Sequence, residues 1–298
     1  MRVFVTGATG FIGSALVREL LDAGHQVLGL ARSEEGAKSL TAAGAQVHRG
    51  NVNDLENLRA GAASSDAVIH LAFNHDFSKF VANCEADRKI IEALGSELAG
   101  SDRLLIATSG VAIVKARPGI PATENGATVS SQAFPRAASE EAAAAVAERG
   151  VRVAVVRLPQ VHDPEKQGLV TYVVEVARQK KSSAYVGEGL NRWPAAHVSD
   201  TAHLYRLALE KTNGNAIYHA VAEEGVPLRE VAEVIGKGLK VPVASITPEQ
   251  AAEHFGWLGM FVGADIPASS ELTRERLGWK PAGPGLISDL EKMNYFPG

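Results

Sequence analysis

The sequence predicts an α/β protein with a doubly wound parallel sheet and a smaller C-terminal lobe. Three observations support this prediction. Short apolar runs alternate with helix-period segments through the first half of the chain, the pattern of parallel strands joined by helices. Gly7, Gly10 and Gly13 come directly after the first apolar run and lead into an amphipathic segment. The second half is punctuated by Pro and Gly and is less regular, so we expect the smaller lobe there.

The elements of the predicted sheet follow from this alternation, in chain order. Its strands are the short apolar runs at Val3–Thr6, Gln26–Leu30, Gln46–Arg49, Ala67–Leu71, Leu104–Thr108 and Arg152–Arg157. The helices between them are expected at Phe11–Ala23, Glu34–Ala43, Leu55–Ala60, Phe77–Leu98 and Ser139–Arg149. Ser33 is the expected N-terminal cap of the second helix.

The second half begins with a stretch rich in turn-forming residues, Pro159–Gly168. After it we expect helices at Leu169–Gln179, Asp200–Glu210, Leu228–Gly238 and Pro248–Phe255, a strand at Ala216–Ala220, and a short helix and a turn from Ala268 on. The expected division is a first domain of residues 1–158 plus about 191–222, and a smaller lobe of about 159–190 plus 223–298. A substrate is expected in the crevice between the two.

Composition narrows the class of protein. The formal net charge is −4 over 298 residues, which gives no electrostatic case for binding nucleic acid or an anionic membrane surface. No apolar run reaches the ~18 residues of a membrane span. The single cysteine, Cys84, excludes an internal disulfide and fits a reducing compartment. We therefore expect a cytoplasmic protein that acts on a small molecule and has neither nucleic-acid nor membrane partners.

The segment Val3–Gly13 has the pattern of a phosphate-binding turn. Gly7 permits a tight turn after the strand, Gly10 lets the backbone approach a diphosphate, and Gly13 lets the helix pack closely on the sheet. The free N–H groups and the positive dipole end of the helix that starts at Phe11 would hold the phosphates. Because the motif follows a strand and opens a βαβ run, the sequence predicts dinucleotide binding on a Rossmann-type sheet.

The end of the second strand indicates which dinucleotide binds. An NAD site usually has Asp or Glu about 20 residues beyond the glycines, bonded to the ribose hydroxyls. This chain has Leu30, Ala31, Arg32 and Ser33 there, and Arg32 is suited to pair with a 2′-phosphate. The alternative is that Arg32 is a solvated surface charge. The sequence therefore favours NADP(H) as the cofactor.

These motifs resemble the short-chain dehydrogenase/reductase superfamily, in its extended and atypical branches of NAD(P)-dependent epimerase/dehydratase-like proteins. The resemblance covers nearly the whole chain and includes Thr6–Gly13, Arg192–Asp200 and Leu277–Trp279. It implies cofactor contacts from Gly7, Thr9, Gly10, Phe11, Ile12 and Gly13, from Asn51 and Val52 near adenine, from Leu71 and Ala72 near the ribose, and from Pro159 and Val161 near the nicotinamide. It also implies a homodimer through the helices expected at 77–98 and 139–149.

The catalytic centre departs from the pattern that this resemblance implies. In that family a Ser or Thr polarises the carbonyl, a Tyr transfers the proton, and a Lys four residues later lowers the pKa of the Tyr. Ser109 fits the first role. Arg136 stands where the Tyr is expected and Glu140 where the Lys is expected, and none of the five tyrosines has Lys four positions later. The usual proton donor is therefore absent from its usual place.

Three functions remain open. The first is an NADPH-dependent oxidoreductase that passes hydride to a carbonyl or imine carbon, with Ser109 orienting the acceptor. Its candidate proton donors lie on the loop after the fourth strand and in the second half of the chain: His75, Asp76, Tyr172 and Tyr185. An iminium substrate needs no donor. The second is a redox-sensing regulator that binds NADP(H) without turnover, and the third is a nucleotide-sugar epimerase or dehydratase, against which the missing Tyr argues.

Other side chains have two possible roles. His70, at a strand end, is expected to be packed and hydrogen-bonded rather than catalytic. Arg136 at a helix start opposes the helix dipole, which favours binding of an anionic group, although a surface arginine is the alternative. Phe255, Trp257 and Phe261 either form a substrate lid or pack the small lobe. The histidines show neither an HExxH pattern nor a one-face helical spacing, so no metal is expected.

Overall fold

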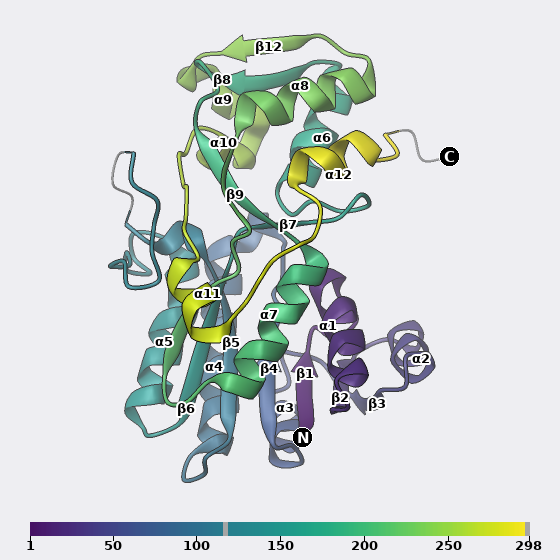
Figure 1. The fold of residues 1–298 in the computed structure, drawn as a ribbon, viewed down its shortest axis with the longest axis vertical. Helices are drawn as coiled ribbons and strands as arrows, with labels where there is room; N and C mark the ends of the chain where they lie inside the picture. The colour runs from purple at the N-terminus through teal and green to yellow at the C-terminus, as the bar shows by residue number, and fades with distance from the viewer. Residues whose placement is uncertain (116–118, 296–298) are drawn as a thin grey trace.

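The computed structural model describes residues 1–115 and 119–295, and its larger part is a seven-stranded parallel sheet (Figure 1). The strands are β1 (Arg2–Thr6), β2 (Gln26–Ala31), β3 (Gln46–Arg49), β4 (Ala67–His70), β5 (Leu104–Gly110), β6 (Arg152–Leu158) and β10 (Ala216–His219). Their order is β10-β6-β5-β4-β1-β2-β3. The direction of winding reverses between β1 and β4, and ligands of such sheets bind outside the carboxyl ends at this reversal.

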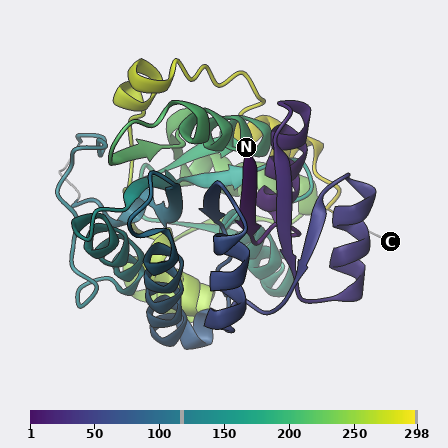
Figure 2. The same cartoon turned by 90° about the horizontal axis from the view of Figure 1, so that it is seen from below.

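Helices cover both faces of this sheet, so the predicted doubly wound α/β fold is confirmed (Figure 2). They are α1 (Phe11–Asp22), α2 (Glu34–Ala42), α3 (Leu55–Ala63), α4 (Phe80–Leu98), α5 (Ala138–Glu148) and α7 (Val198–Lys211), with the short 3₁₀ helices η1 (Phe77–Lys79), η2 (Val111–Ile113) and η3 (Pro135–Ala137). One apolar layer includes Leu16 and Tyr205 of α1 and α7, and the other includes Ile91 of α4. Ser33 caps α2, as predicted, by accepting a hydrogen bond from the Gly36 N–H.

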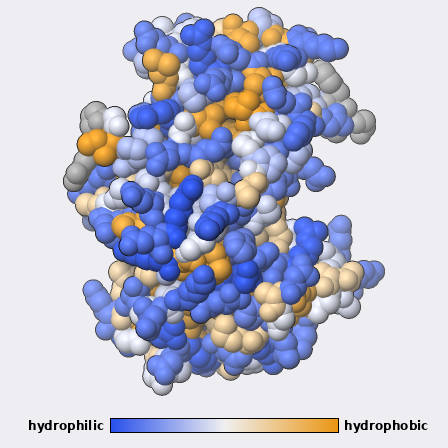
Figure 3. Space-filling view, viewed as in Figure 1, coloured by the Kyte–Doolittle hydropathy of each residue, from blue (hydrophilic) through white to orange (hydrophobic). Residues whose placement is uncertain are grey.

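The smaller lobe stands over the carboxyl edge of the large sheet (Figure 1). It contains one sheet of β7 (Gln160–His162), β9 (Arg192–His197) and β11 (Glu223–Pro227), and another of β8 (Ser183–Val186) and β12 (Val243–Ile246). Its helices are α6 (Val170–Lys180), α8 (Leu228–Leu239), α9 (Pro248–Phe255), η4 (Gly256–Leu258), α10 (Gly259–Val262) and α12 (Leu286–Lys292). They enclose a separate core around Trp193 and Ile235, and hydrophobic side chains also gather on the lobe's surface in Figure 3.

The structure differs from the expected division at two places. Strand β9, expected in the first domain, pairs with β7 and β11 of the lobe. The closing segment contains two short helices rather than one, and the first of them, α11 (Glu271–Leu277), packs against α7 and β10 of the large sheet. Trp279 holds this segment there because its indole N–H donates to the Asp200 carbonyl at 2.9 Å. Residues 116–118 and 296–298 of the expected domains lie outside the described residues.

Across residues 1–115 and 119–295, no helix combines the length and the apolar character that crossing a membrane requires.

Candidate dinucleotide and substrate site

The glycine turn between β1 and α1 depends on two close backbone contacts. Gly7 has a φ of +69°, and a Cβ on it would lie 2.8 Å from the amide nitrogen of Ala72. A Cβ on Gly13 would lie 2.0 Å from the carbonyl oxygen of Gly7. Side chains at these two positions would push α1 away from β1 and the end of β4. The turn therefore requires glycine at both positions, because of its tight backbone and the close helix packing.

The N-terminus of α1 has the features of an anion site. Its cap residue, Gly10, supplies no side-chain hydrogen bond, and its first turn contains no acidic residue. Ser33 and Asp54, in contrast, cap α2 and α3 with their side chains. Unpaired N–H groups and the positive end of a helix dipole favour a diphosphate. This end of α1, beside half-buried Phe11 and Ile12, therefore fits a dinucleotide.

The other expected cofactor residues lie along the same edge of the sheet. Thr9 is exposed on the glycine turn and lies against Gly36 of α2. The rest follow the ends of their strands, with Asn51 and Val52 after β3, Leu71 and Ala72 after β4, and Pro159 and Val161 where β6 gives way to β7. Since the carboxyl ends of parallel strands share one edge, these residues lie along the edge that also carries the glycine turn.

Arg32 is exposed where β2 ends. The neighbouring cation on β3, Arg49, is already engaged, since its guanidinium lies 2.6 Å from the carboxylate of Glu34. Within the described part of the chain no carboxylate pairs with Arg32. Arg32 is therefore available to an anionic ligand, and Glu34 carries a charge that is already balanced.

Lys166 was not identified from the sequence. It lies on the loop after β7, which Asp163 organises by accepting hydrogen bonds from the Glu165 and Lys166 N–H groups, each at 2.8 Å. The Lys166 ammonium is 5.9 Å from the centroid of the Phe11 ring, at the first residue of α1. A cation from the smaller lobe thus faces the open helix end. The Pro and Gly residues of this segment predict a loop but not its neighbours. The contact of Lys166 with Phe11 joins residues far apart in the sequence, so no local pattern reveals it.

Arg136, on η3, is held by a buried carboxylate. Its Nη1 donates to Asp87 Oδ2 at 2.9 Å and its Nη2 donates to the Thr108 carbonyl at 2.9 Å, while the Ser139 hydroxyl contacts both Arg136 and Asp87. Burial raises the pKa of the Asp87 carboxyl, but the charge of Arg136 and the hydrogen bond with His70 outweigh it, so that the pKa lies at about 2. Arg136 is therefore a fixed cation at the end of β5.

His70 connects this cation to the glycine turn. Its Nε2 is 3.0 Å from Asp87 Oδ1, and its Nδ1 is 2.6 Å from the Thr6 hydroxyl. The Thr6 oxygen also accepts a hydrogen bond from the Ala72 N–H at 3.3 Å. A hydrogen-bonded chain thus runs from the end of β1 to Arg136. The prediction that His70 is packed and hydrogen-bonded is confirmed, since the residue is 1% exposed.

Glu140 is engaged by a buried arginine. The Arg157 Nε and Nη2 donate to the two carboxylate oxygens of Glu140 at 2.7 and 2.9 Å. The Arg157 Nη1 lies 3.2 Å from His219 Nε2 and donates to the Glu124 carbonyl at 3.3 Å. Burial lowers the pKa of His219 to about 4, and the charge of Arg157 contributes, although the Glu124 carboxylate opposes it. Glu140 of α5 therefore forms a structural ion pair with Arg157 of β6.

Ser109 is 3% exposed near the end of β5, and its hydroxyl is buried without a hydrogen-bond partner in the described structure. Side chains alternate along a strand, and the Thr108 hydroxyl lies 2.7 Å from Tyr205 on α7. Ser109 therefore faces the opposite side of the sheet, toward α4 and α5, as does its register partner Arg157. A buried hydroxyl without a partner is costly, so this position suits a hydrogen bond to a ligand.

Two of the expected proton donors lie on the exposed loop after β4. Partial desolvation, followed by the positive charges of Arg136 and Lys166, lowers the pKa of His75. Asp76 caps η1 by accepting a hydrogen bond from the Ser78 N–H at 3.1 Å. His75 therefore lies close enough to the cations of the site to respond to them, whereas Asp76 already has a local partner.

The two tyrosine candidates lie in different parts of the smaller lobe. Tyr172, on α6, faces the loop after β4, and its ring centroid is 6.0 Å from that of Phe77. Tyr185, on β8, lies in the two-stranded sheet with β12 at the far end of the lobe, with the Arg229 guanidinium 5.7 Å from its ring centroid (Figure 1). The structure thus brings Tyr172 to the site and does not bring Tyr185 there.

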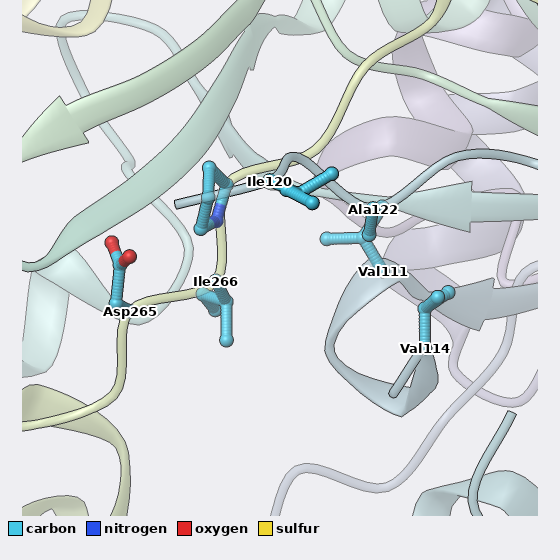
Figure 4. Close-up of a pocket in the computed structure, with 7 residues that line it drawn as sticks. Val111, Val114, Ile120, Ala122, Asp265 and Ile266 are labelled. Atoms are coloured by element: carbon cyan, nitrogen blue, oxygen red, sulfur yellow. The ribbon is translucent and has the colours of Figure 1, made fainter. Parts of the chain in front are cut away.

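Two hollows in the described surface differ in size and lining. A pocket of about 20 Å³ lies among Val111, Val114, Ile120, Ala122 and Ile266 (Figure 4), and it has room for little more than one water molecule. A groove of about 1000 Å³ lies between α5 and β10, and its lining includes Glu140 and Arg157. Neither is lined by the glycine turn.

In the residues that the structure describes, no group of three or more His, Cys, Asp or Glu could hold a metal ion.

Comparisons with known proteins identify this arrangement. The model of the NAD dependent epimerase/dehydratase family matches residues 3–221. A protein of Schizosaccharomyces pombe that carries no functional name is 48% identical over 99% of this chain and 100% of its own length. A ketoreductase of Stigmatella aurantiaca, which acts on a farnesyl dihydroquinoline oxide, is 26% identical over 90% of this chain and 84% of its own. The UDP-glucose 4-epimerase of Thermotoga maritima superposes with a TM-score of 0.76 at 19% identity, over 99% and 97% of the two chains.

Proposed function

Because the chain belongs to the NAD-dependent epimerase/dehydratase family, we propose that it transfers hydride from NADPH to a carbonyl or imine carbon of a small organic substrate. One observation carries this proposal. Gly7 follows β1, Ala72 follows β4, and Ser109 lies at the end of β5, in a row across three neighbouring strands. This row sets an unpartnered hydroxyl and the fixed cation Arg136 beside the dinucleotide turn.

The side chains of this row have distinct roles in the proposed reaction. Bound NADPH supplies the hydride. The Ser109 hydroxyl donates a hydrogen bond to the carbonyl oxygen or imine nitrogen of the substrate and orients its carbon. The Arg136 guanidinium stabilises the negative charge that develops on that atom, because a preorganised cation acts strongly away from water. Arginine keeps its proton throughout the physiological pH range, so Arg136 contributes charge and no proton.

The proton for a carbonyl substrate comes from His75 in this proposal. Its lowered pKa leaves most of the imidazole neutral at pH 7, so ketone reduction is expected to accelerate as the pH falls below 7. An iminium substrate accepts hydride without a proton. His75→Gln is therefore expected to slow ketone reduction and to leave iminium reduction unchanged. Equal effects on both substrates would exclude His75 as the donor.

The preference for NADPH over NADH is assigned to Arg32. Its guanidinium is exposed and without a carboxylate partner among the described residues, so it is free to bind a 2′-phosphate. Arg32→Ala is expected to weaken NADPH binding roughly 10-fold or more and to change NADH binding little. Arg49→Ala is the matched control, since Arg49 is already paired with Glu34. Equal losses for the two nucleotides in Arg32→Ala would remove this assignment.

One of the two named relatives supports reduction over epimerisation, and the other bears only on the fold. The Stigmatella relative is named a ketoreductase, which supports hydride transfer to a carbonyl. The likeness to the Thermotoga epimerase, at 19% identity, concerns the fold. The absence of a Tyr with Lys four positions later also removes the proton-transfer pair that epimerases of this family would use. The epimerase alternative is tested by incubating the protein with UDP-glucose and looking for its 4-epimer.

The direct test follows the absorbance of reduced nicotinamide while the protein is mixed with NADPH and a panel of ketones and cyclic imines. Consumption that is at least 100-fold slower in Ser109→Ala would support the proposed role of Ser109. Consumption that survives this substitution would remove Ser109 from the mechanism. Tight binding of NADPH without consumption of any acceptor would overturn the proposed enzyme.

One observation favours a protein that binds NADP(H) without turnover. The Arg136 guanidinium already donates to Asp87 and to the Thr108 carbonyl, and this can be read as a structural role. Such a regulator would bind NADPH and NADP⁺ with different affinities and would change its conformation between them. Limited proteolysis with each nucleotide distinguishes this alternative from the enzyme.

The homodimer through α4 and α5 stays a prediction. Val81 of α4 is 62% exposed and Ala144 of α5 is also exposed, which is consistent with a partner on these helices. Sedimentation of Val81→Glu against the unchanged protein tests it.

A further inference from the structure

We propose that the junction between the two lobes selects a planar, apolar substrate, which stacks on aromatic side chains contributed by both lobes. This inference rests on the proposed function, because that molecule carries the carbonyl or imine carbon that is reduced. The aromatic cluster that would receive it consists of Phe77, Phe80, Phe134, Tyr172, Trp257 and Phe261.

The centre of the aromatic cluster is a contact between the lobes. Phe77, which follows the loop after β4, stacks on Trp257 of the smaller lobe with ring centroids 4.1 Å apart and 10° between the ring planes. Tyr172 meets both of these rings edge-on, 6.0 Å from Phe77 and 5.2 Å from Trp257. Phe261 closes the other side, 6.3 Å from Phe77. The rings that meet here therefore come from four separate elements, η1, α6, η4 and α10.

The aromatic cluster is continuous with the catalytic candidates. The Arg136 guanidinium lies 4.3 Å from the centroid of the Phe73 ring, and Phe73 directly follows Ala72 beside the glycine turn. The rings continue through His75, 5.2 Å from Phe73 and 6.2 Å from Phe77. An unbroken series of rings thus connects Arg136 to the stacked pair between the lobes. A substrate at Arg136 would place any apolar part against these rings.

The same region remains partly open to solvent. Trp257 is 40% exposed, and Met260, which directly precedes Phe261 in the chain, is 63% exposed. Large apolar side chains that stay exposed around a site commonly mark a binding surface. A flat ring suits the exposed part of Trp257, because offset stacking of one ring on another is favourable.

The charges around the aromatic cluster argue for an uncharged ligand. Of the cations close to this series of rings, Arg136 is balanced by Asp87, and Lys166 faces Phe11 at the dinucleotide turn. Lys79 of η1 lies 3.9 Å from the carboxylate of Asp76. A diphosphate-linked sugar would need charge-assisted contacts of its own at the substrate position. The rings offer apolar area and stacking instead. The chemical class expected is an aromatic or fused-ring ketone or imine.

The protein contains a reporter for this site. Of its three tryptophans, Trp193 and Trp279 are 0% and 1% exposed in the two cores, and Trp257 belongs to the aromatic cluster. A change in tryptophan emission on ligand binding that is lost in Trp257→Phe therefore reports on the aromatic cluster itself.

The experiment measures binding of 1-(2-naphthyl)ethanone by calorimetry with NADP⁺ present, so that no hydride is transferred. Trp257→Ala is expected to weaken binding roughly 10-fold, whereas Trp257→Phe, which keeps a ring, should change it less than threefold. Phe77→Leu, on the opposite lobe, should resemble Trp257→Ala. Tyr185→Ala is the matched control, a ring of the same lobe outside the aromatic cluster. Circular dichroism of each variant checks that it is folded.

The outcomes separate this inference from the proposed function. Binding that depends on Trp257 and Phe77 supports the aromatic site even if NADPH is never consumed, and the proposed reduction alone would then fail. Equal affinity in the wild type, Trp257→Ala and Phe77→Leu would overturn the aromatic site. Binding of UDP-glucose in place of the naphthyl ketone, or reduction of aliphatic ketones at rates unaffected by either substitution, would also overturn it.

Discussion

Asp87→Asn removes one charge from the buried chain that links the glycine turn to Arg136, and it preserves the size of the side chain. Asp87 is 2% exposed, and both of its carboxylate oxygens have partners. Oδ1 faces His70, and Oδ2 faces Arg136 and Ser139. An amide in this place leaves the Arg136 guanidinium without its counter-charge. It also replaces one carboxylate oxygen with an NH₂ group, which then faces either His70 or the donors Arg136 and Ser139.

The magnitude can be worked out from the pKa of Asp87. The difference between about 2 in the folded protein and the ordinary 3.8 corresponds to about 2.5 kcal/mol in favour of the charged form, at about 1.4 kcal/mol per pKa unit. Breaking one partner of a buried ion pair commonly costs about 3–5 kcal/mol. Because the Arg136 side chain is 15% exposed and keeps some hydration, we expect a loss between the value derived from the pKa and the lower part of this range. The predicted loss of unfolding free energy is about 2.5–3.5 kcal/mol.

Urea unfolding at pH 7 measures this loss, and Asp102→Asn, an exposed position two residues before β5, is the matched control. The pH dependence provides a second readout. A carboxyl whose pKa is lowered by folding stabilises the protein above its unfolded value, and this contribution disappears as the pH falls from about 3.8 to about 2. Asp87→Asn should lack that step. A loss below 0.5 kcal/mol at pH 7, or an unchanged acid step, would refute the assignment of the pair.

Three further predictions follow from contacts elsewhere. Gly13→Ala should weaken dinucleotide binding at least 10-fold by calorimetry, since its Cβ would lie 2.0 Å from the Gly7 carbonyl oxygen; unchanged affinity would contradict the close packing of α1. Lys166→Ala should weaken NADPH binding roughly 3- to 10-fold and flatten its dependence on salt, and an unchanged salt dependence would exclude Lys166 from the phosphates. His219, with its pKa lowered to about 4, should make the protein less stable as the pH falls from about 6.5 to 4, and His219→Asn should lose this sensitivity in urea titrations at pH 7, 5 and 4.

The large sheet and the glycine turn could be predicted because their signals are local. Most strands of the sheet are short apolar runs bounded by turn residues, and Gly13 is required by a contact within one strand–turn–helix unit. The Ser33 cap was recognised for the same reason, since an N-terminal cap involves residues three positions apart. Features whose partners lie within one supersecondary unit leave a pattern in the sequence.

The smaller lobe and its contacts with the site could not be predicted in the same way. Its strands β7, β8, β9, β11 and β12 do not alternate regularly with helices, so the pattern that marks the large sheet is missing there. Asp87 and Arg136 are 49 positions apart, and Lys166 reaches Phe11 across the two lobes. Tyr185, a candidate from the second half of the chain, lies away from the site because β8 pairs with β12. Long-range pairing decided each of these outcomes.

The balance of charge at Arg136 also bears on which acceptor the site prefers. Arg136 and Glu140 begin the same helical segment, and each is paired with an opposite charge from another element, Asp87 of α4 and Arg157 of β6. With Asp87 present, the net charge beside Ser109 is close to zero, so a cationic iminium is not repelled. Asp87→Asn would leave Arg136 unbalanced there, and a cation a few ångströms away is then destabilised by about 1 kcal/mol or more. We therefore expect Asp87→Asn to slow iminium reduction more than ketone reduction, and a variant that slows both equally would show that Arg136 does not face the acceptor.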